Sequence, residues 1–139
     1  MTLEELAATL PNGFHDSLVR SVCINYGTRQ VTMDLSVWIG DMEGDQVERE
    51  SRRDGRLVLD GVQFLSMDPP DPTCPFGKGE SIWVDLCAPQ KPFDAIRTIA
   101  EGCFVSGFFV NEWNSFMHVA AREAKLEWAQ APSGIDPKP

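Results

Sequence analysis

The chain is short of basic side chains. Its 139 residues carry 12 Lys and Arg against 21 Asp and Glu, so the formal net charge is −9. Nucleic-acid binding usually needs a basic surface, because an acidic one repels phosphate. We therefore expect no nucleic-acid partner, and the charge favours a basic protein or a neutral small molecule. A general role of the charge in solubility is the alternative.

The motifs that carry most enzyme chemistry are missing as well. The sequence contains no nucleophile elbow, no phosphate-binding loop and no recognised spacing of metal ligands. We therefore lean against an enzyme, assign no catalytic residue, and expect neither a cofactor nor a bound metal.

Long apolar runs and paired cysteines are also absent. No stretch approaches the roughly 20 apolar residues that span a bilayer, and the first residues do not resemble a secretory signal. We expect a cytoplasmic protein, away from membranes, whose cysteines are reduced and serve as small core residues. A zinc site built from Cys74, Cys87, Cys103 and a histidine is the alternative; the fourth cysteine is Cys23.

Alternation of apolar and polar residues is the strongest positive signal. Every second residue from Val31 to Ile39 is apolar, which is the period of a strand buried on one face. The pattern predicts a first hairpin, 18–26 with 31–39, in which Tyr26 pairs with Val31 so that apolar residues share one side. Further strand signals occur at 56–68 and 82–86.

A second hairpin is predicted from 104–113 and 116–128. Pairing Trp113 with Phe116 places Asn111 opposite His118. A helix is predicted near the start of the chain, where Thr2 and Glu5 form a capping-box pattern, and another over 92–101. Residues 41–50 and 68–79 are expected to be a mobile acidic loop and a Pro-rich excursion.

Together these elements predict an α+β fold that is mainly antiparallel β. We expect a curved or partly closed sheet of about six to seven strands, with an N-terminal helix and one short internal helix. Residues 1–130 are expected to form a single β-rich domain, and 131–139 a disordered tail.

His118 is the first candidate for a binding position. The predicted register surrounds it with aromatic residues, among them Trp113, and with Asn111, so it could hold a ligand or act as a general base. The alternative is a core histidine satisfied by Asn111. His15 and Asp16 are the second candidate: Asp16 orders the turn before the first strand, or His15 shares a site with His118.

Two tryptophans, Trp38 and Trp83, fall on the otherwise polar faces of their strands. Either the apolar stripe of the N-terminal helix covers them, or they serve a partner or a homodimer interface, where tryptophan is enriched.

Residues 10–16, LPNGFHD, and 108–116, FFVNEWNSF, resemble segments of short bacterial β-rich proteins of undetermined function, some of which are similar to immunity proteins of toxin systems. The resemblance implies an antiparallel β domain that binds protein. Three functions remain: an immunity-like protein-interaction module with an acidic or aromatic surface, a small-ligand binder using Asn111, Trp113 and His118, and a hydrolase using His118.

Overall fold

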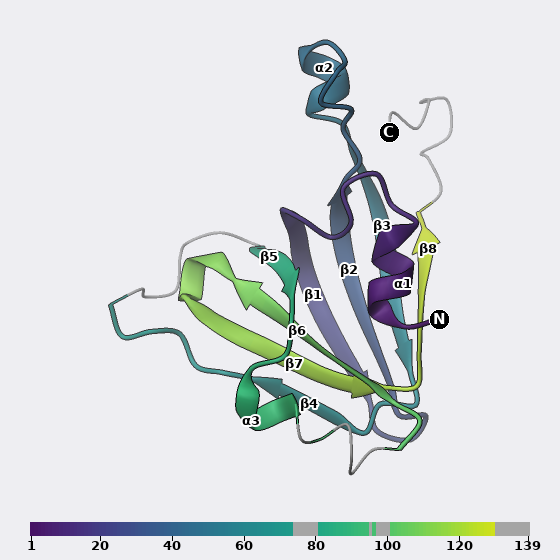
Figure 1. The fold of residues 1–139 in the computed structure, drawn as a ribbon, viewed down its shortest axis with the longest axis vertical. Coiled ribbons are helices and arrows are strands. Elements are labelled where there is room, and N and C mark those ends of the chain that lie inside the picture. Colours follow the sequence, from purple (N-terminus) through teal and green to yellow (C-terminus); the bar gives the residue numbers. More distant parts are fainter. Residues whose placement is uncertain (74–80, 95, 97–100, 130–139) are drawn as a thin grey trace.

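The computed structural model describes residues 1–73, 81–94, 96 and 101–129. Its centre is an eight-stranded antiparallel sheet in the order β4-β7-β6-β5-β1-β2-β3-β8 (Figure 1). The strands are β1 (Ser17–Asn25), β2 (Gln30–Trp38), β3 (Arg52–Asp60), β4 (Phe64–Met67), β5 (Ile82–Cys87), β6 (Phe104–Val110), β7 (Ser115–Ala121) and β8 (Glu123–Trp128). The short helices are α1 (Leu3–Ala8), α2 (Gln46–Arg49), α3 (Lys91–Asp94) and the 3₁₀ turn η1 (Asn111–Trp113).

The predicted mainly antiparallel β fold with a few short helices is confirmed, but the sheet has eight strands rather than six or seven and is not closed. The count differs because two predicted strands each bend into two. The first bends at Gly61, between β3 and β4, and the second at Arg122, between β7 and β8. The two bends lie together, since the Arg122 N–H donates to the Asp60 carbonyl at 2.9 Å. Each strand at an end of the sheet therefore follows the strand next to the opposite end: β4 follows β3, and β8 follows β7.

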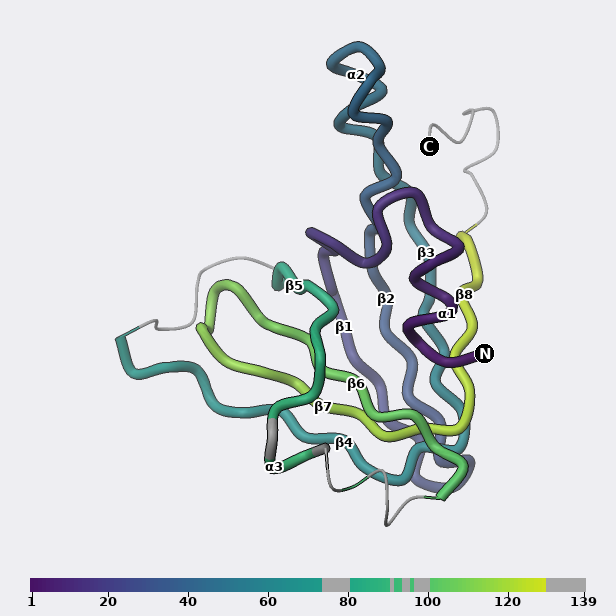
Figure 2. Tube along the Cα trace, viewed as in Figure 1, coloured from purple at the N-terminus to yellow at the C-terminus, as the bar shows by residue number. Residues whose placement is uncertain are grey.

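The core lies between α1 and the sheet. The alternating residues of β2, from Val31 to Val37, are buried together with Leu3 and Leu6 of α1. The helix packs against β8 and β6, and Figure 2 shows it running beside the C-terminal strand. Its capping box is formed as predicted: the Thr2 hydroxyl accepts from the Glu5 N–H at 3.1 Å, and the Glu5 carboxylate accepts from the Thr2 N–H at 3.2 Å.

The predicted register of the first hairpin is wrong by two residues. Val31 pairs with Ile24, and Met33 with Val22, because the turn takes four residues and leaves Tyr26 outside the ladder with 85% of its surface exposed. A shift of two preserves the faces of both strands, so Val22 and Met33 still share one side as expected.

The second hairpin is also shifted. Phe109 pairs with Phe116 and Gly107 with His118, so Asn111 does not face His118. The cause is η1, which takes residues 111–113 out of the ladder before Asn114, at φ 45°, reverses the chain.

Residues 41–50, expected to be a loop, contain the one-turn helix α2, whose N-terminus is capped by the Asp45 carboxylate. The helix α3 occupies the start of the predicted helix 92–101. Three predicted features fall wholly or partly outside the described residues. They are residues 95 and 97–100 of the predicted helix, residues 74–79 of the Pro-rich segment, and the predicted tail 131–139. Within the described ranges, no helix has the length and apolarity needed to cross a membrane.

Candidate functional site

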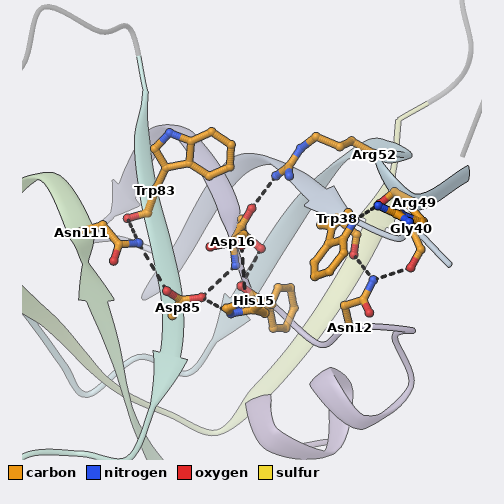
Figure 3. A network of polar contacts seen from close by, with 12 residues as sticks. Asn12, His15, Asp16, Trp38, Gly40, Arg49, Arg52, Trp83, Asp85 and Asn111 are labelled. Carbon is orange, nitrogen blue, oxygen red and sulfur yellow. Dashed lines mark hydrogen bonds and ion pairs between the residues drawn. The ribbon is translucent and has the colours of Figure 1, made fainter. Parts of the chain in front are cut away.

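A network of polar side chains gathers where the turn before β1 meets β5 (Figure 3). We call it the polar cluster and define it by a histidine, two carboxylates, an amide and a guanidinium: His15, Asp16, Asp85, Asn111 and Arg52. The pairing of Ser17 with Val84 brings this turn beside β5. Alternation along β5 then turns Asp85 away from the core-facing Val84.

His15 lies between two carboxylates. Its Nδ1 is 2.6 Å from Asp85 Oδ1, and its Nε2 is 3.3 Å from Asp16 Oδ2. The three side chains remain accessible, with 59%, 49% and 27% of the surface exposed for His15, Asp16 and Asp85. In the described part of the chain, these residues form the one group of three His, Cys, Asp or Glu side chains arranged so that they could hold a metal ion.

Asp85 is held from several directions. Its Oδ1 accepts from the Asp16 N–H at 2.8 Å, and its Oδ2 accepts from Asn111 Nδ2 at 3.3 Å. Partial burial acts to raise the pKa of Asp85, but the hydrogen bonds from Asp16 and Asn111 and the nearby His15 outweigh it and hold the pKa below its usual value. The group is therefore a carboxylate at neutral pH.

Arg52, at the start of β3, fixes the other side of the cluster. Its guanidinium donates to the Asp16 carbonyl at 2.6 Å and to the Ser36 carbonyl at 2.8 Å, and it lies 5.1 Å from the centre of the Trp83 ring. Burial is the main reason that the pKa of Arg52 is lowered. These contacts hold Asp16 at φ 50°, a left-handed conformation that is uncommon for a residue other than glycine.

The polar cluster adjoins a projecting segment, residues 41–50, which we call the acidic arm (Figure 1). The base of the arm is closed by the Trp38 indole N–H, which donates to the Arg49 carbonyl at 2.6 Å, and by Asn12 Nδ2, which donates to the Gly40 carbonyl at 2.9 Å. A side chain at Gly40 would meet the Arg49 carbonyl, so only glycine fits there.

The structure brings together most of the residues singled out from the sequence. His15, Asp16 and Asn111 belong to the polar cluster, and the two tryptophans border it. Helix α1 does not cover the tryptophans, because its buried leucines face the core side of the sheet. Instead Trp38 lies 5.9 Å from the His15 ring, measured between ring centres, and Trp83 lies under Arg52.

Asp85 and Arg52 were not selected from the sequence. Asp85 and Trp83 occupy alternate positions of one strand, so they share its polar face, and this pattern could have marked the carboxylate. No comparable signal marks Arg52, whose place depends on the pairing of β2 with β3.

His118 does not share a site with Asn111, Trp113 or His15. It is fully buried on β7, its ring stacks on Phe93 at 4.1 Å between centres, and its Nε2 accepts from the Gln90 N–H at 3.3 Å. Burial lowers its pKa, against a smaller opposing effect of the Asp68 charge. The alternative interpretation, a core histidine, therefore describes it, although its partner is Gln90 rather than Asn111. Trp113 packs partly buried against the core.

The cysteines are only partly as expected. Cys103 is buried and Cys87 half-buried, but Cys23 is exposed, because it lies on the outer face of β1. These three cysteines are free, and Cys74 lies outside the described residues.

Comparisons with known proteins give no information about the function of the site. No family model, curated protein or solved structure matches this chain.

Proposed function

We propose that this chain is a non-enzymatic protein-binding domain that docks a basic polypeptide on the acidic arm and the adjoining polar cluster. The observation that carries the proposal is the arm itself: a strongly acidic segment is held away from the sheet by specific contacts at its base. Such a role agrees with the immunity-like, cytoplasmic protein that the sequence led us to expect.

Charge supports a basic partner. The arm contains five carboxylates and one arginine, which leaves −4 of the −9 carried by the whole chain; the carboxylates are those of Asp41, Glu43, Asp45, Glu48 and Glu50. All five residues are exposed. A concentrated charge of one sign speeds the approach of an oppositely charged partner and disfavours nucleic acid.

Exposed apolar side chains supply the contact area that charge alone does not. Met42 and Val47 on the arm are 61% and 70% exposed, and Trp83 beside the polar cluster is 39% exposed. Apolar and aromatic anchors within a polar rim are typical of the residues that dominate binding energy at protein interfaces.

The arm is also ordered before any partner arrives. The Asp41 N–H donates to the Glu48 carbonyl at 3.1 Å, and the Ile39 N–H to the Ser51 carbonyl at 2.9 Å. A preorganised segment loses less conformational entropy on binding, which favours affinity.

The other functions have less support. Neither a ligand site nor a hydrolase can be built on His118 as predicted, since its ring is buried and stacked and its expected neighbours Asn111 and Trp113 lie elsewhere. A homodimer through the arm would place two strongly acidic segments against each other, which costs energy.

The test selects ligands from a library of random 12-residue peptides displayed on phage, with the purified chain as the target. We expect the selected peptides to be rich in Lys and Arg and to bind the E43K/E50K double variant at least tenfold more weakly. Both carboxylates are exposed and neither side chain makes a hydrogen bond with the described residues, so the variant should fold.

The matched control is E101K/E123K, which changes the net charge by the same amount at the opposite end of β3, where Glu123 pairs with Asp60. It should retain affinity within about twofold if the arm is the docking surface. Peptides without basic enrichment, or an equal loss of affinity in both double variants, would show that the arm is not the binding surface.

A further inference from the structure

We propose that His15, Asp16 and Asp85 bind one divalent transition-metal ion, such as Zn²⁺ or Mn²⁺. One ligand atom from each of the three side chains lies within 4.8 Å of the others. The site lies in the polar cluster beside the acidic arm and goes beyond the proposed docking function, and it is tested here without any protein partner.

The donor set suits this class of ion. Imidazole nitrogen and carboxylate oxygen are ligands for zinc and manganese, whereas Mg²⁺ and Ca²⁺ prefer sites built from oxygen alone. Ligand atoms about 2.0–2.2 Å from a tetrahedral zinc ion are about 3.3–3.6 Å apart. The 3.3 Å between His15 Nε2 and Asp16 Oδ2 already has this spacing. Asp85 Oδ1, now 2.6 Å from Nδ1 of the same ring, would have to turn from that nitrogen toward the ion to become the third ligand.

The charges also favour a cation. The two carboxylates lie on either side of one imidazole, and one ligand atom from each of the three side chains lies within 4.8 Å of the others. A divalent ion there would balance both carboxylates and replace the contacts that His15 now makes with them. The Arg52 guanidinium does not compete for the carboxylates in this structure, since it donates to the carbonyl of Asp16.

Neighbouring groups hold two of the ligands independently of His15. Asn111 binds the second oxygen of Asp85, and the Asp16 N–H binds the first. Arg52 anchors the Asp16 backbone, and the His15 ring lies beside Trp38. Outer contacts of this kind orient ligands at metal sites. The three side chains are partly exposed, which leaves open positions on the ion for water or for another ligand.

The experiment uses the full chain with C23S as background, because the exposed Cys23 thiol could bind zinc by itself. The protein is treated with EDTA, dialysed, and titrated with Zn²⁺, Mn²⁺ and Mg²⁺ by calorimetry. Co²⁺ absorption reports the coordination, and quenching of tryptophan fluorescence by Co²⁺ reports an ion near one or more of the four tryptophans, of which Trp38 and Trp83 border the cluster. We expect one equivalent of Zn²⁺ or Mn²⁺, weaker Mg²⁺ binding, and a melting temperature that rises with metal concentration.

Three variants locate the site. H15Q and D85N should each weaken Zn²⁺ binding at least tenfold. D34N is the matched control, since Asp34 is a partly exposed carboxylate in an ion pair with Arg56 elsewhere on the sheet, and its affinity should be unchanged. His15 is 59% exposed, so H15Q keeps the test valid even if D85N folds poorly. Circular dichroism checks folding.

The result that overturns the proposal is the absence of a one-to-one complex, or equal affinity in the background protein and in H15Q. In either case the role of His15 is limited to bridging the two carboxylates. Loss of peptide docking in the arm variant bears on neither outcome, so the two proposals can fail separately.

Discussion

At the scale of single residues, His118 shows how burial decides between two roles for the same side chain. Its imidazole is fully enclosed, and its Nδ1 has no hydrogen-bond partner among the described residues. A buried polar atom without a partner costs about 1–3 kcal/mol. Protonation would add a charge to the same enclosed position, which is why the pKa is lowered.

This burial predicts a dependence of stability on pH. Because the folded pKa of His118 lies below its ordinary value of 6.5, the unfolded chain binds a proton first as the pH falls. The free energy of unfolding should therefore decrease between about pH 6.5 and the folded pKa, while the contribution of His118 is fully present above that range. Urea unfolding at pH 7.5 and pH 5.5 measures the difference.

The H118F variant keeps an aromatic ring against Phe93 but removes the titration, so its loss of stability between these pH values should be smaller than that of the wild type. An identical pH dependence in the wild type and H118F would mean that other groups cause the loss of stability as the pH falls.

Most residues of the candidate site could be selected individually from the sequence, but the sequence did not show which of them the fold would bring together. Trp38, Trp83 and His15 stood out because they are large or titratable and placed among polar neighbours. Their meeting depends on the pairing of β1 with β5, strands separated by more than 50 residues, and no local pattern records such a pairing. Asp85 was therefore passed over although its neighbour Trp83 was noticed.

At the scale of elements, local signals predicted which segments form strands and helices, whereas the turns determined the register in which the strands pair. The capping box of α1 and the alternation of β2 depend on residues a few positions apart, and both are as expected. The registers of the two hairpins depend instead on how many residues each turn consumes. Four residues in the first turn and the 3₁₀ turn η1 in the second shifted both ladders.

The bend between β3 and β4 predicts a cost for replacing Gly61. Gly61 has φ 63°, and an added Cβ would lie 2.8–2.9 Å from side-chain carbons of Arg122. We expect Gly61→Ala to lower the free energy of unfolding by about 1–3 kcal/mol, the range for a strained left-handed residue, with the contact adding to it.

Two other glycines separate these effects. Gly102 has φ 81° with nothing within 4 Å of an added Cβ, and Gly27 lacks a positive φ and meets only the Asn25 side chain at 3.4 Å. Urea midpoints should fall most for Gly61→Ala, less for Gly102→Ala, and least for Gly27→Ala. A Gly61→Ala protein as stable as Gly27→Ala would show that the bend tolerates a side chain.

At the scale of the whole molecule, the net charge of −9 opposes compactness. The exposed ion pairs, such as Arg20 with Asp54 at 3.0 Å, each contribute little in water. We therefore expect the melting temperature to rise when NaCl is increased from about 10 to about 200 mM, because salt screens the repulsion among carboxylates.

The rise should be smaller in E43K/E50K, which reduces the net charge. Differential scanning calorimetry in a single buffer measures both proteins. A melting temperature that falls with salt would mean that the ion pairs outweigh the repulsion.

The fold as a whole could be predicted as an antiparallel β domain, but the order of its strands could not. Sequential pairing accounts for β1-β2-β3 and for β5-β6-β7, whereas β5 returns to β1, and β8 returns to β3. The bend at Arg122 directs β8 to β3, and the bend at Gly61 precedes β4, which pairs with β7. A glycine in a strand pattern predicts a bulge without saying which strand it will reach.

The pairing of early strands with late ones has a consequence for the order in which the protein folds. During synthesis β1, β2 and β3 leave the ribosome first, but β3 gains its second neighbour only with β8, near residue 128, and β4 gains its only neighbour with β7. Until then the growing chain carries an unpaired strand edge, the kind of surface through which chains aggregate. Contacts so distant in sequence also slow folding. The last strands made, β7 and β8, are thus the ones that cover the early edges of β4 and β3.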